Sequence, residues 1–216
     1  MHTLYWNRNS SSLAPMAVLE ESGTPYEAVW IDMAAGEHKS PAHRARHPLG
    51  LVPALVLPDG TTLVESAAIT AYGADLNPDN GLAPPVGTPS RGRYMQWLTY
   101  GAATIYTTYM RMYQIYDYRV REGDDECIRA LAERQLVDRW RVVEEALEQT
   151  GGPFLLGDAP SAADIYLAML AGWHHDLPAF WGHSPRIKAM RDGVNRLDGV
   201  RRAVAVHFPG EDLAIA

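Results

Sequence analysis

Apolar and polar positions in the first 77 residues change repeatedly between the alternation of strands and the three-to-four-residue spacing of helices. Pro58-Asp59-Gly60 separates two alternating runs and predicts a β-hairpin. Ser40-Pro41 predicts a helix start, because a proline in the first turn gives up an N–H that would have no helical partner. We expect strands at residues 3–6, 26–31, 52–57 and 61–64, and helices at 12–22, from 40 and at 66–76. This βαβαββα order predicts a small α/β domain.

The rest of the chain has no strand pattern and several helical ones. The stretch NPDNGLAPPVGTP, at residues 77–89, is rich in Pro, Gly, Asn and Asp, so we expect no regular element to cross it. Helices are predicted at residues 90–121, 125–149, 161–171, 184–197 and 199–206. The chain is therefore expected to have an α/β domain at 1–77, a linker at 78–89 and an all-α bundle at 90–216.

Composition and charge limit the kinds of molecule that this protein is expected to bind. The formal net charge is −7, and there is no run of Lys or Arg that would favour nucleic acid or a membrane surface. No apolar stretch approaches the ~20 residues of a membrane span, and residues 1–20 lack a signal-peptide pattern, so we expect a cytoplasmic protein. The single cysteine, Cys127, is interpreted as structural. His174, His175 and His183 have no carboxylate or thiol at ligand spacing, so no metal is expected.

The segment LGLVPALVLPDGTTLVESAAI, residues 49–69, carries the most specific chemistry. A cis bond before Pro53 would turn the backbone outward, so that Val52 offers its N–H and C=O to an extended peptide. Glu65 and Ser66 stand where a helix begins, and free N–H groups there favour a carboxylate, with Glu65 available for an amino group. This combination fits a γ-glutamyl tripeptide, glutathione.

Each of these residues also has a purely structural interpretation. Pro53 alone is compatible with an ordinary strand entry, and Ser66 alone with a helix cap. Their order in one segment favours the binding interpretation. Lys39 or His38, in the loop before the second helix, is a candidate partner for the glycyl carboxylate, although a loop lysine is commonly only solvated.

Several segments together resemble the glutathione transferase superfamily over essentially the whole chain. They are LYWNRNSSSLAPMAVLEESGTPYE, the V-P-A-L segment, the E-S pair and LLGDAPSAADIYLA. The resemblance is to bacterial cytosolic members, nearest in pattern to the beta, nu and theta-like classes. It implies a thioredoxin-like N-terminal domain, an all-helical C-terminal domain, a cis bond before Pro53 and a homodimer. Ser161 and Asp164 match the family's S-x-x-D box, to which we assign only a folding role as N-cap and N3 residues.

Glutathione chemistry needs a group that stabilises the thiolate. A free thiol has a pKa near 8.5, and lowering it by about two units takes roughly 2.7 kcal/mol. A hydrogen bond to the sulfur and a helix N-terminus together supply about that amount, so the donor should precede the first helix. Pro15 places the N-cap near Ser12, which is therefore mostly a cap. The remaining candidates are Asn9, Ser10, Ser11 and, at the end of the first strand, Tyr5.

The resemblance orders these candidates without deciding among them. Counted back from Gly23, Ser11 falls where the beta class carries its cysteine, and Asn9 falls where serine-type classes carry their hydroxyl. Tyr5 falls where tyrosine-type classes carry their phenol. We favour Ser11, then Ser10, Asn9 and Tyr5, each as a hydrogen-bond donor to the thiolate. Leu51 replaces a polar residue that many relatives use on the tripeptide backbone, so one contact is expected to be missing.

A tyrosine stripe marks a candidate pocket for a second substrate. Tyr106, Tyr109, Tyr113 and Tyr116 share one helical face, which suits either core packing or the wall of an apolar pocket with polar tips. Arg111 is a candidate partner for an anion.

Three functions remain open at this point. The first is a glutathione transferase of detoxification type, which attacks a small apolar electrophile. The second is a glutathione-dependent disulfide reductase or peroxidase, and the third is a protein that binds glutathione without catalysis.

Overall fold

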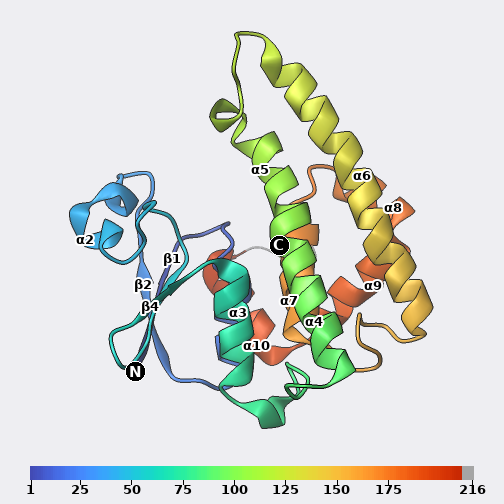
Figure 1. The fold of residues 1–216 in the computed structure, drawn as a ribbon, viewed down its shortest axis with the longest axis horizontal. Helices are drawn as coiled ribbons and strands as arrows, with labels where there is room; N and C mark the ends of the chain where they lie inside the picture. The colour runs from blue at the N-terminus through green and yellow to red at the C-terminus, as the bar shows by residue number, and fades with distance from the viewer. Residues whose placement is uncertain (211–216) are drawn as a thin grey trace.

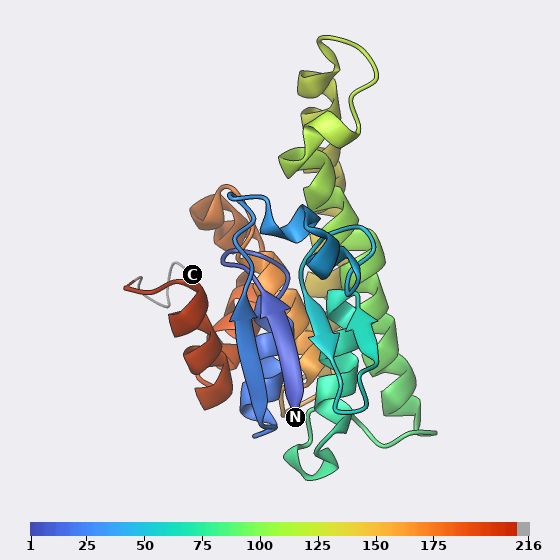
Figure 2. The same cartoon turned by 90° about the vertical axis from the view of Figure 1, so that its left-hand side faces the viewer.

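The N-terminal part of the protein is a four-stranded sheet with helices on both faces. The computed structural model describes residues 1–210. The strands are β1 (His2–Trp6), β2 (Tyr26–Trp30), β3 (Ala54–Val56) and β4 (Thr62–Val64). Their order is β2-β1-β3-β4; β1 runs parallel to β2 and antiparallel to β3, which pairs antiparallel with β4. Figure 2 shows the sheet face on, with its strands side by side and helices behind them.

Alternation along β1 decides which side chains enter the core. His2, Leu4 and Trp6 are buried, whereas Thr3 and Tyr5 are half-buried on the opposite face. Three helices complete this part of the fold, namely α1 (Leu13–Glu21), α2 (Pro41–Arg44) and α3 (Ser66–Asp75). In Figure 1, α2 lies on one side of the sheet, and α3 lies on the side that meets the remaining helices.

The remaining elements are helical. They are α4 (Pro89–Tyr100), a π-helical turn (Gly101–Tyr106), α5 (Thr107–Tyr113), α6 (Asp124–Thr150), α7 (Ala162–Ala171), α8 (Leu177–His183), α9 (Pro185–Val194) and α10 (Asp198–His207). The predicted single helix at 90–121 is wrong, because it is interrupted by the π turn and ends at Tyr113. Gly101 in that turn lies against Tyr166, and an added Cβ would come within 2.9 Å of its ring. The sequence interpretation also missed α8, although Asp176 caps it by accepting from the Ala179 N–H at 3.0 Å.

Helix α7 lies at the centre of the helical part, with every residue from 162 to 171 buried. The predicted box fixes its start. The Asp164 carboxylate accepts from the Ser161 N–H at 2.8 Å, the Ser161 hydroxyl at 2.7 Å and the Leu155 N–H at 2.8 Å. Burial raises the pKa of Asp164, and these hydrogen bonds oppose that shift.

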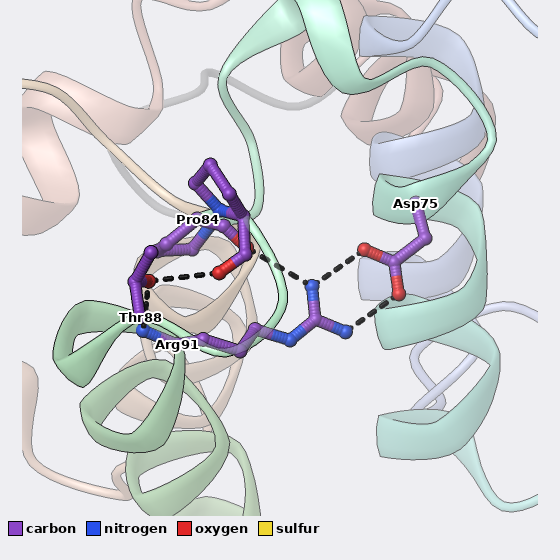
Figure 3. Close-up of polar contacts among 5 residues, drawn as sticks. Asp75, Pro84, Thr88 and Arg91 are labelled. Atoms are coloured by element: carbon purple, nitrogen blue, oxygen red, sulfur yellow. Dashed lines mark hydrogen bonds and ion pairs between the residues drawn. The ribbon is translucent and has the colours of Figure 1, made fainter.

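An ion pair joins the end of α3 to the start of α4 across the predicted linker (Figure 3). The Arg91 guanidinium donates to both Asp75 carboxylate oxygens at 2.6 Å and to the Pro84 carbonyl at 3.3 Å. Thr88 caps α4 by accepting from the Arg91 N–H at 3.2 Å.

These observations confirm the predicted fold class, a thioredoxin-like α/β part followed by an all-helical part. We call residues 1–77 the thioredoxin-like half and residues 90–210 the helical half. The division at residues 77 and 90 stays a prediction, and residues 211–216 of the predicted bundle lie outside the described residues. Within residues 1–210, no helix combines the length and apolarity that crossing a membrane requires.

Candidate active site

An unpaired stretch of backbone precedes β3. The Val52–Pro53 bond is cis, and β3 begins only at Ala54. Among residues 1–210, no group bonds to the Val52 N–H or C=O. The side chains of Val52 and Pro53 are buried, so the backbone is held in place while its polar groups stay available. An N–H and a C=O on one residue are the donor and acceptor that an extended peptide backbone needs.

Two basic side chains hold the loop that leads to Val52. The buried His43 ring bonds through Nε2 to the Leu51 carbonyl at 2.7 Å. The Lys39 ammonium donates to the carbonyls of Leu49 and Gly50, both at 3.2 Å. Lys39 is exposed and keeps one N–H beyond these two bonds. The structure therefore gives Lys39 a bracing contact that the sequence did not predict, and His43 was missed altogether.

Glu65 and Ser66 form the second element, at the start of α3. Glu65 has a φ of 71°, uncommon for a residue with a side chain, and its carboxylate is exposed. Ser66 is buried, and its hydroxyl shares a 3.0 Å hydrogen bond with the Tyr166 hydroxyl of α7. No side chain caps this helix, so its first N–H groups have no side-chain partner and stand at its positive dipole end.

The loop between β1 and α1 distinguishes the three serines. The Ser10 hydroxyl donates to the Asn7 carbonyl at 2.7 Å, and the Ser12 hydroxyl does so at 3.1 Å. These two hydroxyls also bond to each other. Ser12 is the N-cap residue of α1, as predicted, but its hydroxyl makes no side-chain cap because it donates to the Asn7 carbonyl. The buried Ser11 hydroxyl instead lies close enough to Tyr106 to lower the pKa of that phenol.

Tyr5 and Asn9 lie apart from this arrangement. The Tyr5 ring packs beneath the Arg46 guanidinium, 4.5 Å from the ring centroid, and 6.1 Å from the His43 ring. It therefore belongs to the sheet face that carries α2. Asn9 is exposed with a φ of 47°, and it lines a cavity beside α1.

Three aromatic side chains of the helical half lie near Ser11 and Ser66. The Tyr106 ring lies 5.5 Å from Trp173, and Tyr166 bonds to Ser66. Burial raises the pKa values of both tyrosines; the nearby Glu65 carboxylate adds to each rise, and the Ser11 and Ser66 hydroxyls oppose it. Both phenols therefore keep their protons at neutral pH and serve as donors. Sequence analysis did not assign Tyr166 or Trp173, although Tyr166 is a lone hydroxyl within an apolar run two residues after the box.

The tyrosine stripe is only partly at the cleft. Tyr109 is fully buried, with Trp140 Nε1 donating to its hydroxyl at 3.1 Å, so it belongs to the core and does not line a pocket. Tyr113 donates to the Trp173 carbonyl. Arg111 donates to the Gln135 side chain of α6 at 3.0 Å, so the helical half already supplies a partner for it. Packing of Trp140 and Trp173 over the stripe accounts for these corrections.

Comparison with known proteins agrees with this geometry. Residues 12–76 match the family model described as the glutathione S-transferase N-terminal domain. The chain is 31% identical to glutathione S-transferase GstA of Escherichia coli O157:H7 over 79% of this chain and 81% of that protein. It is also 30% identical to maleylacetoacetate isomerase of Rhizobium meliloti over 76% of each chain.

Solved structures lead to the same family. A ternary complex of BphK, a bacterial glutathione S-transferase, superimposes with a TM-score of 0.83 at 29% identity, over 95% of this chain and 98% of that one. A glutathione transferase homologue from Sulfitobacter with bound glutathione superimposes with a TM-score of 0.82 at 27% identity, over 94% and 96% of the two chains. The coverage extends over both halves described above. The chain therefore belongs to the glutathione transferase superfamily.

Proposed function

We propose that this protein is a glutathione transferase that binds glutathione along Val52 and forms its thiolate beside Ser11 and Tyr106. The observation that carries the proposal is the unpaired N–H and C=O of Val52, next to the uncapped start of α3. Together they offer main-chain partners for a short peptide and a positive end for its carboxylate.

Each part of the tripeptide has a partner in this arrangement. The γ-glutamyl carboxylate takes the N–H groups at the start of α3 and the Ser66 hydroxyl, and Glu65 takes the ammonium. The cysteinyl backbone pairs with Val52. The free N–H of Lys39 is within the same loop and serves the glycyl carboxylate, with no contact from Leu51.

The thiol then lies where the two halves face each other. Of the serines before α1, Ser10 and Ser12 use their hydroxyl protons on Asn7, which leaves Ser11 for the sulfur. Hydrogen bonds to a charged group contribute about 1.5–3 kcal/mol each, so Ser11 and Tyr106 together exceed the roughly 2.7 kcal/mol needed to lower the thiol pKa by about two units. Neither side chain becomes covalently attached.

In the transfer step the thiolate attacks an electrophilic carbon. A carbon–sulfur bond forms, and the leaving group departs with the electron pair of its bond to that carbon. Ser11 and Tyr106 stabilise the sulfur anion before the attack and release it as its charge is lost. A homodimer and a role in detoxification stay predictions from the resemblance, and a cytoplasmic location stays a prediction from the sequence pattern.

The first test is calorimetric titration with reduced glutathione, followed by turnover of 1-chloro-2,4-dinitrobenzene. Ser66→Ala should weaken binding about tenfold or more, the value of one hydrogen bond to a carboxylate, and Ser90→Ala, at an exposed position on α4, should not. No binding at millimolar glutathione would refute the proposal. Binding with turnover of disulfides or peroxides alone would favour the reductase function, and binding without any turnover would favour a non-catalytic protein.

A further inference from the structure

The cavity that Asn9 lines lies among α1, α7, α9 and α10. Its volume is about 220 Å³. Its walls are mainly apolar and include Leu13, Ala17, Ile165, Met169, Val194 and Val204. The charged exception is Arg191 of α9. A pocket with apolar walls and one charged group at a fixed point is typical of a small-molecule site.

Arg191 is buried without a partner for its charge. It is only 4% exposed, yet within residues 1–210 its guanidinium has neither a hydrogen bond nor an ion pair. The Trp181 ring lies close to it, with its centroid 5.6 Å away. The charge of Asp192, whose carboxylate is bonded to Lys188, acts on Arg191 without forming an ion pair with it. A buried guanidinium without a direct partner is costly, and an anionic ligand would offset that cost. Arg91, by contrast, has both Asp75 oxygens within 2.6 Å.

Two residues that line the cavity are close to the proposed thiolate donors, in sequence or in space. Asn9 lines it and belongs to the same loop as Ser11. Trp173 also lines it and packs 5.5 Å from Tyr106, the other proposed donor to the thiolate. Asn9 and Trp173 therefore join the wall of the cavity to the residues proposed to stabilise the thiolate.

The cavity size limits what enters. Pockets for drug-sized ligands measure about 300–1,000 Å³, so this one holds only a small molecule or one end of a larger one. A guanidinium matches a carboxylate with two parallel hydrogen bonds. We propose that Arg191 binds the carboxylate of the electrophile, so that this transferase selects substrates with an apolar body and one anionic end. The inference rests on the proposed function, because it assigns the second substrate of that reaction.

A matched pair of substrates tests the inference, namely 4-chloro-3-nitrobenzoate and its methyl ester. In both, the glutathione sulfur forms a bond to the chlorinated ring carbon, and chloride leaves with the carbon–chlorine electron pair. The carboxylate takes no part in the chemistry. Any difference between the two in the response to a substitution therefore reports recognition of the anionic end.

Arg191→Met should lower kcat/KM for the carboxylate about tenfold or more and leave kcat/KM for the ester within about twofold. Arg191→Lys should restore part of the preference because it keeps the charge and loses the paired geometry. Arg201→Met, at an exposed position on α10, is the control and should change neither substrate. Equal losses for the acid and the ester in Arg191→Met would overturn the inference.

Thermal unfolding separates recognition from a structural role. Since an unpaired buried cation is replaced by an apolar side chain of similar length, the melting temperature of Arg191→Met should stay the same or rise. A marked fall would indicate that Arg191 supports the fold.

Failure of the proposed function is distinguishable from failure of this inference. If the wild-type protein turns over neither compound, the transferase proposal fails first. Calorimetric titration with 4-chloro-3-nitrobenzoate alone then decides the Arg191 site. The inference is supported if the acid binds, the methyl ester does not, and Arg191→Met abolishes binding of the acid. Equal binding of the acid and the ester would overturn the inference.

Discussion

The thioredoxin-like half contributes both backbone groups and nearby side chains to the proposed glutathione site, whereas the helical half contributes side chains that are far apart in the sequence. Val52 and the start of α3 lie within one segment of residues 52–66. Tyr106, Tyr166 and Arg191 come from three different elements and meet only through helix packing. A binding site made of one short segment is thus encoded locally, and the site for a second substrate depends on how distant helices pack.

The largest expected effect concerns the packing of α7, which carries Tyr166. Asp164→Ala would leave the Leu155 N–H, the Ser161 N–H and the Ser161 hydroxyl without their shared acceptor inside the protein. We expect a loss of about 3–5 kcal/mol in the free energy of unfolding, measured by urea denaturation. The exposed Asp158 provides the control, since Asp158→Ala should change stability by less than about 0.5 kcal/mol. Equal stability of the two variants would show that the box does not hold the helical half.

A slightly smaller effect concerns the contact between the two halves. His207 of α10 is buried 4.9 Å from the Trp6 ring, and within residues 1–210 neither ring nitrogen has a partner. Burial, together with the nearby Arg8 charge, lowers the pKa of His207 to about 4. The unfolded chain takes up this proton near pH 6.5 and the folded chain only near pH 4, so the contribution is complete above pH 6.5 and is lost as the pH falls towards 4.

That loss should amount to about 3 kcal/mol in the free energy of unfolding. Denaturation at a series of pH values measures it, with His207→Phe as the test and His183→Phe, at an exposed histidine, as the control. His207→Phe should remove this part of the acid sensitivity. If its pH profile matches that of the wild-type protein, the junction between the halves is not pH-sensitive through His207.

The smallest effect tests the backbone character of the thioredoxin-like half. Gly50 has a φ of +62°, and an added Cβ would lie 2.4 Å from the His38 carbonyl oxygen. Gly50→Ala should therefore displace the loop before Val52 and weaken glutathione binding about tenfold, equivalent to about 1.4 kcal/mol. Gly60→Ala is the matched control, because Gly60 also has a positive φ, +87°, but open space around it. Similar affinities in the two variants would show that the loop position does not control binding.

The same contrast explains how much could be predicted from the sequence. The order of strands and helices, the box at Ser161 and Asp164, and the presence of a turn before Val52 follow from short-range patterns. Which tyrosines of the stripe are buried cannot be predicted from such patterns, because contacts with Trp140 and Trp173 decide which ring is covered. The sequence around Arg191 does not indicate that its side chain is buried beside a cavity, because that burial depends on how α9 packs against other helices.

The most direct test of the account is to measure the pKa of the glutathione thiol in the complex. The thiolate absorbance, recorded as the pH is raised, gives this pKa. We expect a pKa about two units below the free value of about 8.5 in the wild-type protein. Ser11→Ala should raise it by about one unit or more, and Ser10→Ala should leave it nearly unchanged because its hydroxyl donates to Asn7. A pKa that moves in Ser10→Ala and stays low in Ser11→Ala would contradict the account.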